Sequence, residues 1–142
     1  MTDKQEDFKP IPIPSSIEDV TPDLCRRVFV EILGGTVDKK PTRWLEGKTI
    51  CSDIRWRLNG QVFGSESFNL FKNIADTKLL DKWVVGNGFI MNVDLLRNGN
   101  WECRVFFSHN SGIGYVSRTA PTEEMARACA IIDAYNKLKG GK

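Results

Sequence analysis

The sequence has one histidine, His109, and no long apolar run. No uninterrupted apolar stretch approaches the roughly 20 residues that a transmembrane helix needs, so we expect no contact with a membrane. The amino-terminal residues are polar and acidic rather than basic and apolar. We therefore expect neither a signal peptide nor a lipid anchor, and we expect a cytoplasmic protein.

Motifs that carry catalysis are also missing. No Cys-x-x-Cys, G-x-S-x-G, H-E-x-x-H or Walker pattern occurs, and His109 alone could serve as an imidazole base. His109 lies in a polar loop, 109–114, whose two glycines do not complete a phosphate-binding fingerprint. We expect no enzyme activity, no metal site and no cofactor. Buried, reduced thiols are the expected state of the four scattered cysteines, which are Cys25, Cys51, Cys103 and Cys129.

Length and charge point to one ordinary folded domain. The chain has 142 residues and a net charge of +2, so it lacks the basic excess that typifies a nucleic-acid-binding protein. We place a flexible, proline-rich tail at residues 1–15 and a single domain at 16–142. Three alternating prolines, Pro10, Pro12 and Pro14, exclude a helix in this tail. It could be a free leader, a segment lying along the domain, or a docking peptide for a partner.

The first part of the domain contains sequence signals for two helices and a β-hairpin. Thr21 and Pro22 suit the cap and first position of a helix over 21–33, which Gly34 and Gly35 would end. Asn59-Gly60 is a strong two-residue turn signal, and it would join a strand over 50–58 to one over 61–63. A short second helix is predicted over 76–85.

The last third has the clearest periodicity. Strictly alternating segments at 89–96 and 101–107 flank Asn98-Gly99 and predict a hairpin, followed by a third strand over 115–118. An amphipathic helix begins near Pro121 and ends at Gly140. The expected fold is α+β: an antiparallel sheet of three to five strands packed against two or three helices, with a carboxy-terminal β-β-β-α unit.

Arginines and aromatic residues are the main candidates for ligand binding. On an open sheet face they could contact phosphates and stack on bases, although the tryptophans could equally belong to the core. The candidate binding residues are Arg43, Trp44, Arg55, Arg57, Arg104, Arg118 and His109. A double-stranded-RNA-binding domain is rejected, because acidic residues would stand where its final helix contacts phosphate. A nucleotide-binding pocket near Asn92, Asp94 and the 109–114 loop is a further alternative.

Several segments resemble the phage ABA-sandwich domain, a family of small tailed-phage and prophage proteins of mostly unassigned function. The similar features are the helix start at residues 21–24, the tryptophan-containing helix at 79–85, Trp101-Glu102-Cys103, and the Thr119-Ala120-Pro121 step into an alanine-rich helix. The resemblance covers roughly residues 21–33 and 76–138, and it makes residues 36–72 an insertion.

The resemblance implies a phage accessory protein expressed in the host cytoplasm, and it implies no active-site residue. Our leading hypothesis is therefore a non-enzymatic protein that binds a host protein, such as a defence component, and inhibits or modulates it. A nucleic-acid-binding module that uses the arginines and a small nucleotide-ligand sponge are the alternatives. The sequence leaves the oligomeric state open.

Overall fold

A computed structural model describes residues 9–39, 43–45, 48–50, 54–63, 70–107 and 114–140. In chain order its helical elements are η2 (Ile17–Asp19), α1 (Pro22–Glu31), α2 (Ile74–Thr77), η3 (Lys78–Leu80), α3 (Asp81–Gly86) and α4 (Glu123–Gly140). Its strands are β1 (Thr36–Lys39), β2 (Arg43–Leu45), β3 (Lys48–Ile50), β4 (Ile54–Leu58), β5 (Gln61–Phe63), β6 (Ile90–Leu95), β7 (Trp101–Phe106) and β8 (Tyr115–Ala120).

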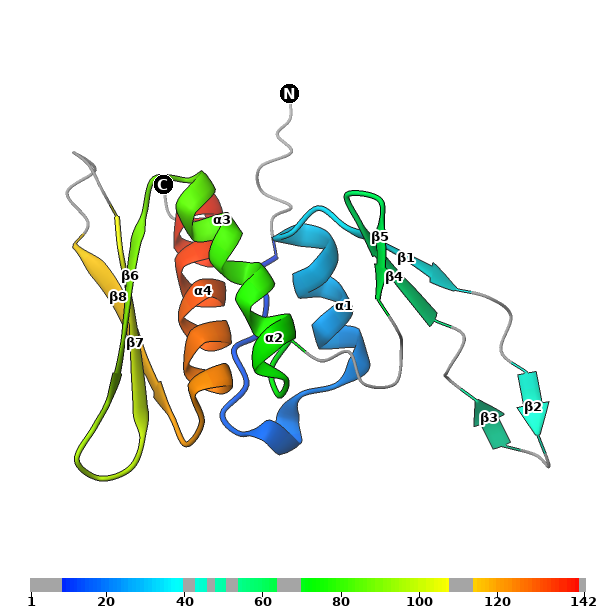
Figure 1. The fold of residues 1–142 in the computed structure, drawn as a ribbon, viewed down its shortest axis with the longest axis horizontal. Helices are drawn as coiled ribbons and strands as arrows, with labels where there is room; N and C mark the ends of the chain where they lie inside the picture. Colours follow the sequence, from blue (N-terminus) through cyan, green and yellow to red (C-terminus); the bar gives the residue numbers. More distant parts are fainter. Residues whose placement is uncertain are drawn as a thin grey trace.

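The α+β class and the carboxy-terminal β-β-β-α unit are confirmed. The described strands form two antiparallel three-stranded sheets, β1-β4-β5 and β6-β7-β8, and a separate β2-β3 pair. Figure 1 shows the helices between the two three-stranded sheets, with α4 beside β6-β7-β8 and α1 on the side of β1-β4-β5. The described strands within 36–72 therefore form a three-stranded sheet and a separate pair, and none of them extends the carboxy-terminal sheet.

Local signals in the sequence set several element boundaries. The hydroxyl of Thr21 accepts a hydrogen bond from the backbone N–H of Leu24 at 3.1 Å, which caps α1 as predicted. Asn59 and Gly60 have φ angles of 53° and 83°, as a two-residue turn of type I′ requires between β4 and β5. The helix predicted over 76–85 is present, but it is divided into α2, η3 and α3.

The main core lies between α4 and the inner face of the β6-β7-β8 sheet. Cys103 and Val105 of β7 and Val116 of β8 are buried there, while small residues of α4 allow close approach of the helix. Cys25 and Cys129 are buried as well, so the expected burial of the thiols is confirmed at every cysteine except Cys51, which lies outside the described residues.

The described part of the proline-rich segment corresponds to the alternative of a segment lying along the domain, and not to the flexible tail placed at residues 1–15. Residues 9–14 pack against the domain: Ile11 is only 1% exposed and Pro14 is buried. Burial of a large aliphatic side chain offsets the entropy of ordering this segment, which forms no helix or strand. The packed structure therefore starts at least as early as Lys9, and residues 1–8 lie outside the described residues.

Candidate functional sites

The predicted arginine and tryptophan residues are distributed over two sheets and a separate strand pair. Arg43 and Trp44 lie on β2, Arg55 and Arg57 on β4, Arg104 on β7 and Arg118 on β8. The helices separate β4 from β7 (Figure 1). His109 lies outside the described residues. The strands that carry Arg57, Arg104 and Arg118 therefore belong to two different sheets.

Arg104 and Arg118 lie on opposite faces of the same sheet. Arg118 is the register partner of buried Cys103, and its Nε donates to Asp133 Oδ2 of α4 at 3.1 Å. Arg104 is on the other face, where its Nη2 donates to Glu102 Oε1 at 3.0 Å. Each guanidinium thus has a carboxylate partner, which reduces the positive potential that it could offer to a phosphate.

The outer face of the β6-β7-β8 sheet is the first candidate site. Figure 1 shows the helices on the opposite side of this sheet. We name this surface the open sheet face; three residues from each strand form it, namely Ile90, Asn92, Asp94, Glu102, Arg104, Phe106, Tyr115, Ser117 and Thr119.

One end of the open sheet face is apolar. Ile90, Phe106 and Tyr115 are neighbours in register across the three strands, and the rings of Phe106 and Tyr115 have centroids 5.2 Å apart. Ile90 is 60% exposed and Tyr115 is 53% exposed. Contiguous exposed apolar side chains are unfavourable in water, and they are typical of surfaces that bind another molecule.

The rest of the open sheet face is polar and ordered by hydrogen bonds. Glu102 accepts from Arg104 and, through Oε2, from the hydroxyl of Ser117 at 2.7 Å. These two donors, Arg104 first, hold the pKa of the Glu102 carboxyl below its usual range. Asp94 is the register partner of Glu102 on β6. Asp94, Glu102 and Arg104 are therefore part of one charged surface network.

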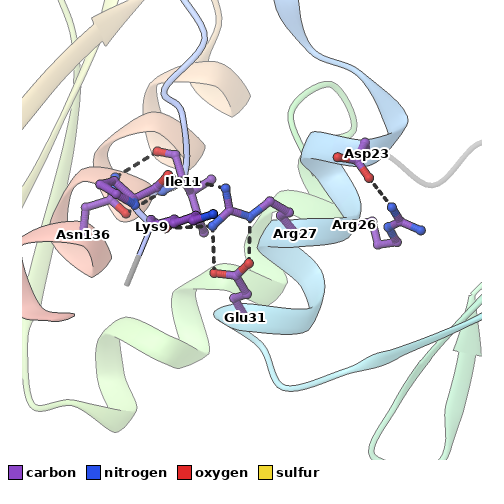
Figure 2. Close-up of polar contacts among 8 residues, drawn as sticks. Lys9, Ile11, Asp23, Arg26, Arg27, Glu31 and Asn136 are labelled. Carbon is purple, nitrogen blue, oxygen red and sulfur yellow. Dashed lines mark hydrogen bonds and ion pairs between the residues drawn. The ribbon is translucent and has the colours of Figure 1, made fainter. Parts of the chain in front are cut away.

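The second candidate site surrounds the backbone of residues 9–14. The Asn136 side chain of α4 accepts from the backbone N–H of Ile11 and donates to its carbonyl oxygen, each at 2.9 Å. Arg27 of α1 donates to the carbonyl oxygens of Lys9 at 2.8 Å and Pro10 at 3.4 Å. Figure 2 shows these side chains reaching the segment from the two helices. The thiol of Cys129 donates to the carbonyl oxygen of Pro14 at 3.7 Å. We name the set of three side chains that contact the segment, Arg27, Cys129 and Asn136, the segment groove.

The three described cysteines are poor candidates for a catalytic nucleophile. Burial raises the pKa of Cys25 to about 11, that of Cys103 to about 12 and that of Cys129 to about 11. These thiols are consequently protonated near neutral pH, and the thiolate is the reactive form. The described residues contain no group of three or more His, Cys, Asp or Glu side chains placed to hold a metal ion.

Sequence reasoning named Asn92, Asp94 and Arg104 of the open sheet face. It missed the apolar row on that face and the contacts of the segment groove, although signals for both were present. Ile90, Phe106 and Tyr115 fall on the outward positions of alternating strands, where polar residues are usual. Ile11 interrupts a run of prolines, and Asn136 is a weak helix former within a long helix.

Across the part of the chain that the structure describes, no helix is long and apolar enough to cross a bilayer.

Comparison with known proteins returns no match to any family, to any curated protein or to any solved structure.

Proposed function

We propose that this protein is a non-enzymatic accessory protein of the phage type, which binds a host protein, such as a defence component, and inhibits or modulates it in the host cytoplasm. The observation that carries the proposal is the apolar row on the open sheet face, in which Ile90 and Tyr115 are exposed and Phe106 between them is partly buried. The phage assignment is supported by the sequence resemblance alone.

The composition of this surface suits a protein partner. Aromatic and aliphatic side chains at the centre of an interface supply most of the binding energy, and hydrogen-bonded polar groups at its rim supply orientation. Phe106 and Tyr115 would be the aromatic anchors. Glu102 and Arg104, already held in place by a hydrogen bond, would form the polar rim on one side.

The experiment is affinity purification of the tagged full chain from a bacterial lysate, with and without nuclease treatment. Ile90→Arg and Tyr115→Arg change the apolar row, and Val62→Arg is the matched control at a similarly exposed position on β5. We expect a stoichiometric host protein with the native chain and with Val62→Arg, and its loss with either of the other variants. Thermal unfolding must show that all three variants remain folded.

Other outcomes overturn the proposal in different ways. A host protein that all variants retain equally would place the interaction elsewhere on the molecule. Nucleic acid recovered alone, and lost after nuclease treatment, would favour the nucleic-acid-binding alternative. If the column retains neither, a thermal-shift screen against nucleotides tests the ligand-sponge alternative, because a ligand at 100 times its Kd stabilises a protein by about 2.7 kcal/mol.

A further inference from the structure

The contacts to residues 9–14 are mostly contacts to backbone atoms. Asn136 binds both backbone groups of Ile11, Arg27 binds the carbonyl oxygens of Lys9 and Pro10, and the thiol of Cys129 donates to the carbonyl oxygen of Pro14 at 3.7 Å. Backbone groups are common to all peptides. The segment groove therefore recognises an extended chain largely through features that another peptide would share.

Three side chains of the segment pack against the domain, and the two most deeply buried supply most of the specificity; the third, Ile13, is partly buried against the core. Ile11 and Pro14 are buried, whereas Pro12 between them is exposed. A polyproline II helix has three residues per turn, so side chains three positions apart lie on the same face. The burial pattern of the segment thus matches an Ile-x-x-Pro peptide that presents one face to a groove, which is a common mode of peptide recognition.

The groove itself is held in a defined conformation. Glu31, one turn after Arg27 on α1, accepts from Arg27 Nε at 2.7 Å and from Nη2 at 3.2 Å. This bidentate pair fixes the guanidinium so that its remaining donors point at the segment (Figure 2). Asn136 belongs to the long helix α4. A groove built from helix side chains can therefore keep its shape when one bound peptide replaces another.

We infer that the segment groove is a binding site for an extended Ile-x-x-Pro segment of a partner protein, and that residues 9–14 are its resident ligand in cis. A tethered ligand competes at an effective concentration of about millimolar, so a free peptide binds the native chain weakly. The groove lies on elements other than the open sheet face, and failure of either proposal leaves the other unaffected.

The test uses a fluorescein-labelled synthetic peptide with the sequence of residues 9–16 and the full-length protein, with binding measured by fluorescence anisotropy. Ile11→Ser should release the resident segment, and Pro12→Ala, at an exposed position, is the matched control. We expect the Ile11→Ser chain to bind the peptide about tenfold more tightly than the native and Pro12→Ala chains do, because more of its grooves are vacant. Asn136→Ala in the Ile11→Ser background should abolish this gain.

Peptide variants check the specificity. A peptide with serine in place of both buried residues, Ile11 and Pro14, should not bind, whereas one with alanine in place of Pro12 should bind like the parent. A folded Ile11→Ser chain that binds no more tightly than the native chain would overturn the inference. The inference would also be overturned if the native chain forms concentration-dependent dimers that the peptide dissociates. In that case a second copy of this chain, and not a partner protein, would occupy the segment groove.

A second measurement applies if Ile11→Ser does not fold. A protease site inserted between Ser15 and Ser16 of the full chain allows the segment to be severed after folding. The labelled peptide should then exchange into the groove, as followed by native mass spectrometry. A severed chain that unfolds, or one that never exchanges its segment, would show that residues 9–14 are only a structural part of the domain.

Discussion

The ring of Phe29 packs edge-on against that of Trp56, with centroids 5.2 Å apart and planes at 88°. Both side chains are buried, and together they join α1 to the β1-β4-β5 sheet. The aromatic pair leaves little space beside it. Gly35, directly before β1, occupies that space because it has no side chain.

We expect Gly35→Ala to destabilise the protein by about 3 kcal/mol or more. A Cβ atom at this position would overlap the ring of Phe29, which is fully buried, and lie 2.8 Å from the backbone oxygen of Arg57. Urea unfolding measures the effect. Gly86→Ala is the matched control, because a Cβ atom there meets nothing within 4 Å.

Gly86 is the last residue of α3, where alanine is at least as favourable as glycine. The control variant should therefore be unchanged or up to about 1 kcal/mol more stable. If Gly35→Ala and Gly86→Ala lower the free energy of unfolding equally, general helix and loop effects, and not the packing around Phe29, determine the loss of stability.

We expect Asn136→Ala to lower the free energy of unfolding by about 2 kcal/mol. The substitution removes two hydrogen bonds and leaves the backbone N–H and carbonyl of Ile11 without these partners in a part-buried position. Urea unfolding measures the change, with Lys137→Ala as the control at the adjacent exposed position. A loss no larger than that of Lys137→Ala would mean that the segment contributes little to stability.

The sequence could predict features set by neighbouring residues, but not contacts between residues far apart in the chain. Thr21, Pro22, Asn59 and Gly60 act on their immediate neighbours, and the α1 cap and the β4-β5 turn were therefore predictable. The bond between Ile11 and Asn136 spans 125 residues, and no local pattern specifies such a partner. The division of the strands into separate sheets likewise depends on how the helices pack between them (Figure 1).

The candidate arginines show a different limitation. Alternation along β8 places Arg118 with buried Val116 and Ala120, and alternation along β7 places Arg104 with Glu102 and Phe106. The sequence thus contained enough periodicity to assign these two arginines to different faces. It could not supply the partner of Arg118, because Asp133 reaches this arginine only once α4 has packed on the sheet.

The Glu102 carboxyl should titrate below the usual value of about 4.3 for glutamate. We expect Ser117→Ala to raise its pKa toward that value and Arg104→Met to raise it further, since Arg104 is the larger cause. NMR titration of the carboxyl carbon measures both changes. Thr119→Ala, at the neighbouring position of the open sheet face, is the control and should leave the pKa of Glu102 in place.

The same shift predicts how stability depends on pH. A carboxyl whose pKa is lower in the folded state stabilises the fold above its unfolded pKa, and this stability is lost as the pH falls through the folded pKa. Glu102→Gln should therefore flatten the loss of stability on acidification below about pH 4.3. If the free energy of unfolding falls as steeply in acid for Glu102→Gln as for the native protein, the hydrogen bonds from Arg104 and Ser117 do not persist in solution.

Arg127 connects α4 to α3 and is the most enclosed of the ion-paired arginines among the described residues, with a side chain 13% exposed. Its Nη1 donates to Asp81 Oδ2 at 2.9 Å, and its Nη2 lies 2.7 Å from Glu123 Oε2. We expect Arg127→Met to destabilise the protein by roughly 2–3 kcal/mol at neutral pH, because it removes the ion-pair partner of the half-buried Asp81 and leaves only the weaker charge interaction with Lys78. Arg26→Met is the control, since Arg26 and Asp23 are well exposed and should contribute less than about 1 kcal/mol.

The pH dependence of the Arg127→Met variant separates loss of charge from loss of packing. Burial raises the pKa of Asp81 in the native protein, and Arg127 opposes this effect, so the substitution should raise the pKa of Asp81 further. A carboxyl with a raised folded pKa stabilises the fold when it is protonated, and this contribution disappears as the pH rises through that pKa. The deficit of Arg127→Met relative to the native protein should therefore narrow as the pH falls from 7 toward 4, when both are compared by urea unfolding. A deficit that stays constant over this range would assign the effect to the packing of the arginine side chain instead of to the unpaired Asp81.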